Sequence, residues 1–195
     1  MKGFSFDELH IIADEMFTSH VTAEMTVEQK KKASEDLFDE LLDLMIYYCI
    51  LARDDLIADL GVSVTVGDDT DRMYETIMKR IDGKNLRDRV TEEVGSGTPG
   101  TFRRLVDSEA HRNYCTTADE TAEKILSAMG WSGTKTWQTM LDDKVRETHS
   151  YLQSATVPIT EEFYTFDGDH APYPGGFQDV ENNVNCRCFL QYSLS

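Results

Sequence analysis

Two cysteines near the end of the chain and two histidines upstream of them are the residues whose types could do chemistry. Cys186 and Cys188 are two positions apart, so in an extended strand both side chains point to the same side. Two thiolates on one side can bind the same metal ion, and zinc takes four ligands from thiolate, imidazole and carboxylate groups. With His149 and His170 as the imidazoles, the sequence offers a structural zinc site. The alternative, two cysteines packed in a small core, stays open because the spacing fits no standard zinc finger.

The same residues offer a catalytic alternative, a zinc hydrolase or a thiol transferase that uses His149, Cys186 and Cys188. A cysteine nucleophile needs a base and a lowered pKa, which His149 and the positive charge of Arg187 would supply. However, a Cys-Arg-Cys strand near the chain end lacks a helix N-terminus that would activate the thiol. Phosphate-binding glycine loops, Gly-x-Ser-x-Gly and His-Glu-x-x-His are also absent from the sequence. We therefore expect no catalytic residues and no enzyme.

A row of charged residues precedes the cysteines. Asp142, Arg146 and His149 are spaced i, i+4 and i+7, so within one helix they share a face. Asp142 lies N-terminal to Arg146, which is the favourable order for an ion pair on a helix. One interpretation is a structural network that ties this helix to the strand that carries Arg187, and the other is a charged active-site face. We favour the structural network.

Helices must form most of the scaffold that positions these residues. Ser5 with Glu8, and Thr26 with Gln29, have the spacing of capping boxes, and apolar residues follow at helical intervals. The Gly- and Pro-rich stretch 95–100 predicts the most flexible link of the chain, and the alternation in 61–67 predicts a short extended segment. The predicted helices span residues 5–25, 26–60, 68 or 69 to 81, 86–94 and 102–129.

After Gly130 the sequence changes character and predicts a small mixed unit. A loop rich in Ser, Gly and Thr lies between Trp131 and Trp137, and a short helix follows over 140–152. The two predicted strands span residues 163–166 and 187–192.

The predicted fold class is therefore mainly α (α+β), a helical body with long helices that carries a small C-terminal helix plus β-hairpin unit. We place an N-terminal helical region at residues 1–100 and a C-terminal domain at 101–195. That domain begins with a long helix and ends with the small α/β unit, residues 131–195.

Composition limits the function classes. The 195 residues are 40% hydrophobic and 10% aromatic, which suffices for a packed core. No apolar run approaches the ~20 residues needed to span a bilayer, and the N-terminus lacks a signal-peptide stretch. We therefore expect a soluble protein made in a cytoplasm, with no membrane partner. The 4 cysteines fit that compartment without a disulfide framework.

The net charge of −17 disfavours direct nucleic-acid binding, because proteins that hold the phosphate backbone show a basic face. The plain interpretation is a solvated acidic surface that keeps the protein soluble. The sharper alternatives are a basic protein partner and a free-standing acidic regulator that mimics DNA. The DNA mimic predicts carboxylates regularly spaced on one continuous face.

Five segments of the chain form an ordered set of motifs. They are FRRLVDSEAHR (102–112), WQTMLDDKVRETH (137–149), PITEEF (158–163), APYPG (171–175) and NCRC (185–188). Taken in this order, they resemble the phage Mu protein-F-like minor head proteins, also called phage head morphogenesis proteins. The resemblance covers roughly residues 100 to 192 and does not extend to the first hundred residues. Ser154 stands where the family usually has a glycine after the histidine helix, so the turn there is expected to differ.

The resemblance implies a virion protein, present in few copies, that lies inside the capsid near the portal. Its implied partners are portal and capsid proteins, which it meets in the host cytoplasm during head assembly, and it can leave with the DNA at ejection. The implied activity is binding and assembly without turnover. Arg146, His149, Cys186 and Cys188 would then hold the C-terminal unit together, and Glu109 would pair with one of the arginines.

Overall fold

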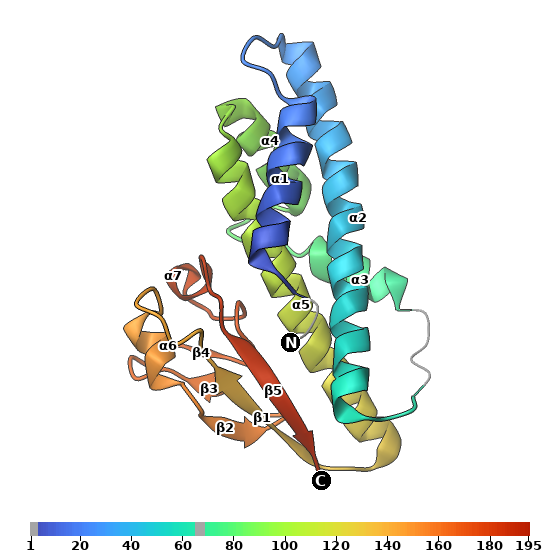
Figure 1. Cartoon of the computed structure of the whole chain (residues 1–195), viewed down its shortest axis with the longest axis vertical. Coiled ribbons are helices and arrows are strands. Elements are labelled where there is room, and N and C mark those ends of the chain that lie inside the picture. The colour runs from blue at the N-terminus through green and yellow to red at the C-terminus, as the bar shows by residue number, and fades with distance from the viewer. Residues whose placement is uncertain (1–3, 65–68) are drawn as a thin grey trace. The chain divides into compact units, whose positions relative to one another are not determined.

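The computed structural model describes residues 4–64 and 69–195 of the chain. Its internal contacts divide the chain into two compact units. Unit 1 comprises Met1–Gly3, Cys49–Gly67 and His111–Ser195. Unit 2 comprises Phe4–Tyr48 and Asp68–Ala110. The fold is mainly α with a small antiparallel sheet, which confirms the predicted class (Figure 1).

Unit 2 is built from helices. It contains the N-terminal parts of two long helices, α2 (Val27–Leu60) and α5 (Pro99–Met129), which continue into unit 1. Three shorter helices complete it, namely α1 (Phe6–His20), α3 (Thr70–Ile77) and α4 (Leu86–Ser96). Apolar side chains at helical intervals form its core, and the fully buried ones include Leu9, Ala13, Leu37, Leu41, Met45, Val90, Phe102 and Val106.

The predicted helix starts are confirmed by their caps. The Ser5 hydroxyl accepts a hydrogen bond from the Glu8 N–H at 3.3 Å. The Thr26 N–H donates to the Gln29 side chain at 2.8 Å, and the Gln29 N–H donates to the Thr26 hydroxyl at 3.3 Å. These side chains satisfy N–H groups that have no partner within the first turn of a helix.

Helix ends and the links between helices differ from the prediction at several positions. α1 ends at His20 instead of residue 25, because Val21 is already extended, with φ of −113°. The stretch 95–100 is a tight junction, since α4 continues through Ser96 and α5 begins at Pro99 with Gly97 in the left-handed region between them. The predicted third helix ends at residue 77 instead of 81. Of the predicted extended segment, residues 62–64 form no strand and residues 65–67 lie outside the described part.

The predicted domain boundary at residue 100 falls inside unit 2, just after the start of α5. Helices on both sides of that position contribute residues to the same unit. As a division into domains, the boundary stays a prediction.

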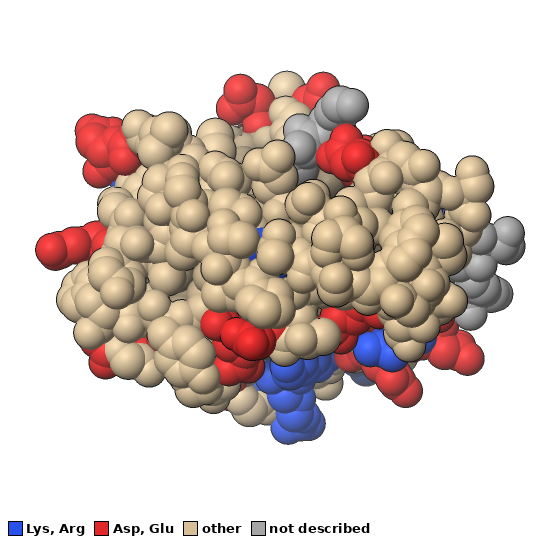
Figure 2. Space-filling view, turned by 90° about the horizontal axis from the view of Figure 1, so that it is seen from below, with Lys and Arg blue, Asp and Glu red and all other residues tan. Residues whose placement is uncertain are grey.

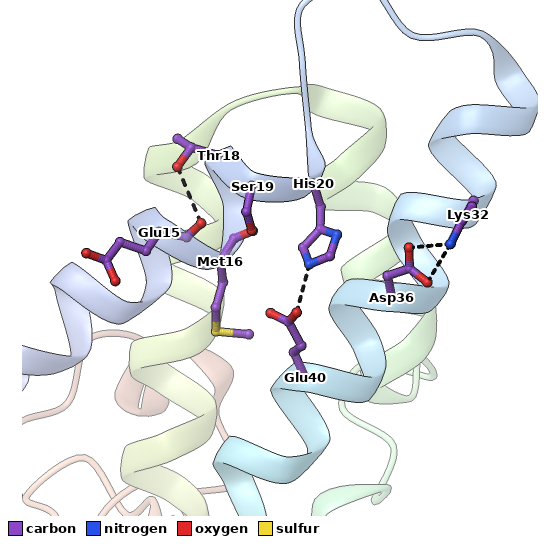
Figure 3. Close-up of polar contacts among 8 residues, drawn as sticks. All are labelled: Glu15, Met16, Thr18, Ser19, His20, Lys32, Asp36 and Glu40. Carbon is purple, nitrogen blue, oxygen red and sulfur yellow. Dashed lines mark hydrogen bonds and ion pairs between the residues drawn. The ribbon is translucent and has the colours of Figure 1, made fainter.

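Polar contacts lie within and between the helices of unit 2. His20 Nε2 lies 2.9 Å from Glu40 Oε1, and Lys32 pairs with Asp36 one turn along α2 at 2.7 Å (Figure 3). His10 Nε2 lies 2.7 Å from Asp107 Oδ2. Pairs this exposed contribute little stability, so packing of the apolar stripes is what holds the unit together.

Unit 1 combines the C-terminal parts of α2 and α5 with a small sheet. Its three antiparallel strands lie in the order β2 (Thr156–Pro158), β1 (Gly133–Gln138) and β5 (Phe189–Leu194). A separate two-stranded pair joins β3 (Phe163–Tyr164) and β4 (His170–Ala171). The short helices are α6 (Glu147–Tyr151) and α7 (Val180–Asn183).

The predicted hairpin partners are wrong, although both strands exist. β3 pairs with β4, and β5 pairs with β1, in the stretch that the sequence assigned to a loop. β1 places Lys135 and Trp137 inward and both are fully buried. A lysine at an inward position hides the apolar alternation by which a half-buried strand is normally found.

The predicted helix over 140–152 is also wrong in its first half, because only α6 is helical. Leu141 has a φ of +54°, in the left-handed region, which ends any helix there. The Asp142 carboxylate accepts a hydrogen bond from the Lys144 N–H at 3.1 Å. Such a local bond from a side chain competes with helical bonding.

Ser154, where the resembling family has glycine, adopts the backbone that favours glycine, with φ of +62°. The left-handed region costs a non-glycine residue roughly 1–2 kcal/mol, part of which the flexibility of glycine offsets. We expect Ser154→Gly to raise the free energy of unfolding by about 0.5–1 kcal/mol in urea titrations. Ser150→Gly, inside α6, is the matched control and should lower it. Equal losses in both variants would contradict the prediction.

Gly133 opens β1 where the sheet leaves no room for a side chain. A Cβ added there would lie 2.7 Å from the Ser193 carbonyl oxygen and 2.9 Å from Ile159 Cδ1. Because the first contact is backbone, the β1–β5 pairing must shift, and we expect Gly133→Ala to cost about 1–3 kcal/mol in urea unfolding. Gly95→Ala, on α4 with open space around it, is the control and should be neutral or stabilising. A Gly133→Ala variant as stable as wild type would refute this packing.

Acidic residues are spread over the face shown in Figure 2. Asp and Glu side chains stand there in separate groups with uncharged surface between them. That face therefore does not carry the continuous carboxylate row expected of a DNA mimic. Within residues 4–64 and 69–195, no helix is both long and apolar enough to cross a membrane.

Candidate functional site

Three residues in unit 1 bring ligand atoms together. His149 on α6 places its Nδ1 3.6 Å from the Cys186 sulfur and 3.4 Å from the Cys188 sulfur. Their potential ligand atoms all lie within 4.8 Å of one another, and all three residues are buried. Both cysteines lie just before β5, so the sheet fixes their position relative to α6. We call this group the His-Cys-Cys centre.

The distances of the His-Cys-Cys centre suit a tetrahedral metal site. Zinc bonds of ~2.3 Å to sulfur and ~2.0–2.1 Å to nitrogen place the two atoms about 3.6 Å apart at a tetrahedral angle. The measured sulfur–nitrogen distances, 3.4 and 3.6 Å, are close to that value. Hydrogen bonds between thiol and imidazole have similar lengths, so these distances also fit a metal-free pair of packed cysteines.

The pKa values of the two thiols are shifted in opposite directions. A hydrogen bond from Cys186, together with His149, lowers the pKa of Cys188 despite its burial. The same bond and burial raise the pKa of Cys186 well above its usual range. The hydrogen bond between the two sulfurs thus favours the thiolate on Cys188 and the thiol on Cys186. A divalent cation would favour both thiolates, because metal binding deprotonates its sulfur ligands.

An aromatic shell encloses the centre. The Phe177 ring stacks on the His149 ring at 5.2 Å, and Trp137 meets the same ring edge-on at 5.7 Å. His149 Nε2 is buried and makes no hydrogen bond within the described part of the chain. Trp137, Phe163, Ala171, Phe177 and both cysteines belong to one hydrophobic cluster. The shell would exclude water and hold the imidazole in place.

His170, the fourth predicted zinc ligand, does not join the centre. Its ring stacks on Tyr164 at 5.2 Å, and its Nε2 lies 3.5 Å from a Glu162 carboxylate oxygen. β3 and β4 hold this pair. The structure therefore brings together three of the four predicted ligands.

The predicted charged row is rearranged. Because residues 142–146 are not helical, Asp142 does not share a helix face with His149. Both Asp142 oxygens instead accept from Arg187 at 2.7 and 2.8 Å, which lowers the pKa of Asp142. Arg146 donates to the Val184 carbonyl oxygen. These contacts tie the turn before α6 to the segment that carries the cysteines.

Glu109 pairs with Arg89, and both residues lie in unit 2. Its side chain is 1% exposed, so the ion pair is nearly removed from water. The expected arginine partner thus comes from α4. The contact supports unit 2 instead of the C-terminal unit.

Sequence reasoning missed a second buried polar group in unit 1. The Lys135 ammonium lies 3.0 and 3.1 Å from the two Asp119 oxygens, and the Tyr192 hydroxyl donates to Asp119 at 3.1 Å. Burial raises the pKa of Asp119 to about 6 against the opposing effect of Lys135. No spacing motif links these three residues, so only the fold could reveal them.

A second thiol–imidazole pair in unit 1 is inert. His111 Nε2 lies 2.7 Å from the Cys188 carbonyl oxygen and 3.5 Å from the Cys115 sulfur. Burial lowers the pKa of His111 to about 4 and raises that of Cys115 well above its usual range. Both groups are neutral near pH 7, whereas a nucleophilic cysteine needs the thiolate. All four cysteines of the chain are free and buried.

Comparison with known proteins gives one informative similarity. No protein-family model and no solved structure matches the chain. The chain is similar to the NAD(+)--arginine ADP-ribosyltransferase EFV of Enterococcus faecalis, with 33% identity over 85 residues. The match covers 44% of this chain and spans 17% of that protein's length. The expectation that the chain is not an enzyme is contradicted by this relative, because it is named for an enzymatic activity. Absent motifs were too weak a ground for that exclusion.

Proposed function

We propose that this chain is a phage minor head protein that associates with portal and capsid proteins during head assembly. The observation that carries the proposal is the convergence of the four C-terminal segments that resemble that family. Trp137, Phe163, Ala171 and Cys186 come from four different segments, yet all belong to one buried cluster. A shared fold requires that residues from separate motifs build one core, and the common cluster supports the proposal in this way.

The remaining segment, 102–112, lies mostly in unit 2, and its last two residues belong to unit 1. A Cβ added to Gly175 would lie 3.5–3.7 Å from Arg112, so the Pro-Gly turn packs against that residue of α5. Gly175 has a φ of +86°, a conformation that glycine adopts readily. The proposed location is the inner capsid near the portal, with the host cytoplasm as the place of assembly.

We further propose that the His-Cys-Cys centre holds a structural zinc ion. Two sulfurs and one imidazole nitrogen supply three of the four ligands that zinc takes, so a group other than His170 must complete the site. Zinc bound there would lock α6 to the segment before β5. The bound zinc ion would thus stabilise unit 1.

Virion association tests the head-protein proposal. Antibodies against the purified chain should detect it in gradient-purified proheads and virions of a phage that carries this gene. A tagged chain should also co-purify with the portal oligomer. Consistent absence from both particles, with the protein present in the lysate, would reject the proposal.

An arginine-specific ADP-ribosyltransferase is the second candidate, favoured by the similarity to EFV. Because the match spans 17% of that protein, the activity of the whole relative comes to this chain only as a hypothesis. Incubation with labelled NAD+ and an arginine-rich acceptor protein tests it. Label transfer that survives hydrolysis of ester linkages would support the activity, and no transfer above a heat-denatured control would remove it.

A further inference from the structure

Unit 1 contains a groove with a volume of about 510 Å³, and its lining includes none of the three residues of the His-Cys-Cys centre. Volumes of about 300–1,000 Å³ are typical of ligand sites. Small side chains line it where α2 and α5 contribute Ala52, Cys115 and Ala118, all buried. The other walls come from residues 138–140 and from β5. We call it the α2/α5/β5 groove.

The charged groups that line the groove are all acidic. Asp55 and Asp59 lie one turn apart on α2, and the lining includes no lysine, arginine or histidine. The Tyr114 hydroxyl donates to the Asp55 carboxylate at 2.7 Å, which fixes the orientation of that carboxylate. This charge disfavours phosphate, nucleotide diphosphate and carboxylate ligands and favours a cation.

Aromatic rings supply the second feature of a cation site. Tyr114, Phe189 and Tyr192 line the groove, and the first two rings meet edge-on with centroids 6.3 Å apart. A cation over an aromatic face is attracted by the negative charge of that face, most strongly where water is excluded. Met140, 49% exposed, adds an apolar surface for the stem of a long side chain.

The residues that line the groove do not favour nucleophilic chemistry by a cysteine thiol. Cys115 lines the groove, but burial raises its pKa and leaves the thiol protonated. Its neighbour His111 is neutral as well. The groove therefore suits binding of a cation and not nucleophilic attack.

We infer that the α2/α5/β5 groove binds an arginine side chain presented by a basic segment of a partner protein. A guanidinium is flat, stacks on aromatic rings and donates two parallel hydrogen bonds to a carboxylate. The groove offers rings and carboxylates in one place, and an ammonium lacks the flat fork of donors that matches both. The inference is independent of the proposed head-assembly role, because it rests on the groove alone.

A titration with short capped peptides, followed by NMR of the labelled full chain, tests the inference. The probes are acetyl-Gly-Arg-Gly-amide and the same peptide with citrulline, lysine or glutamate in place of arginine. We expect the arginine peptide to shift the amides of Asp55, Tyr114 and Gln191 with a Kd on the order of 1 mM. The lysine peptide should bind more weakly, and the citrulline and glutamate peptides should not saturate.

Matched variants locate the site. Asp55→Asn and Asp59→Asn should each weaken the arginine peptide at least fivefold. Asp54→Asn is the control, because Asp54 lies on the same helix, pairs with Arg53 and does not line the groove. It should change the Kd less than twofold, and unchanged spectra of the variants confirm their folding. Equal binding of the citrulline peptide, equal loss with Asp54→Asn, or shifts located elsewhere would overturn the inference.

Discussion

Removal of the proposed zinc ion is expected to destabilise unit 1 strongly. Zinc binding supplies ~10–16 kcal/mol of apparent free energy in zinc-finger peptides, and part of that appears as folding stability. Apolar packing of the cluster around Trp137 adds stability of its own, so we expect a loss of about 4 kcal/mol on chelation. In a chain of this size, that loss lowers the Tm by roughly 8–16 °C. Calorimetry before and after dialysis against a chelator measures it.

Variants of the centre should reproduce the loss of metal. Wild type purified with zinc should hold one ion per chain by elemental analysis, whereas Cys188→Ser and His149→Ala should hold far less. Cys49→Ser is the control, because Cys49 is buried outside the His-Cys-Cys centre and should leave the zinc content unchanged. Cobalt substitution should give sulfur-to-metal charge-transfer absorption in wild type only. A wild type without zinc and insensitive to chelator would establish the metal-free packed cysteines instead.

Replacing Lys135 by methionine is expected to give the second large effect. The Lys135 side chain is 0% exposed and Asp119 is 4% exposed, so the change leaves a carboxylate buried without its cation. Breaking such a pair on one side costs about 3–5 kcal/mol, or roughly 6–20 °C in Tm. Urea unfolding measures the change. Lys32→Met is the control, because Lys32 is 75% exposed and should matter little.

The pH dependence identifies the cause of the Lys135→Met defect. Burial raises the pKa of Asp119 from 3.8 to about 6, so the folded state binds a proton more readily than the unfolded state. The contribution of Asp119 to stability therefore falls as the pH rises from about 4 to about 6. Without Lys135 the folded pKa rises further, and the variant is least impaired where Asp119 is neutral. Its defect should be larger at pH 8 than at pH 5, and a pH-independent defect would point to lost packing.

Local chemistry made much of the helical architecture predictable. Ser5 and the Thr26/Gln29 pair mark helix starts through their own hydrogen bonds, which depend only on neighbours in sequence. The sheet was less accessible, because an inward Lys135 breaks the alternation and is tolerated only through Asp119, 16 positions earlier. Strand pairing depends on such distant partners, which spacing along the chain does not reveal.

The candidate site was predictable in part for the same reason. The i, i+2 spacing placed Cys186 and Cys188 on one side, and the expected approach of His149 is what the structure shows. His170 was included only because it was an available imidazole, and its stacking on Tyr164 depends on β3–β4 pairing. The Asp142–Arg187 contact depends on a non-helical backbone at Leu141. The residue types around Leu141 do not predict that break in the helix.

Because the cysteine thiols are buried, their reaction with an alkylating reagent can report local unfolding of unit 1. All four cysteines lie in unit 1, and none exposes more than 4% of its surface. An alkylating reagent can reach them only when that unit opens, so labelling rates under native conditions measure local unfolding. Peptide mass spectrometry would separate Cys49 and Cys115, on the long helices, from the pair before β5. Opening of the helical and sheet portions could thus be timed separately without adding a probe.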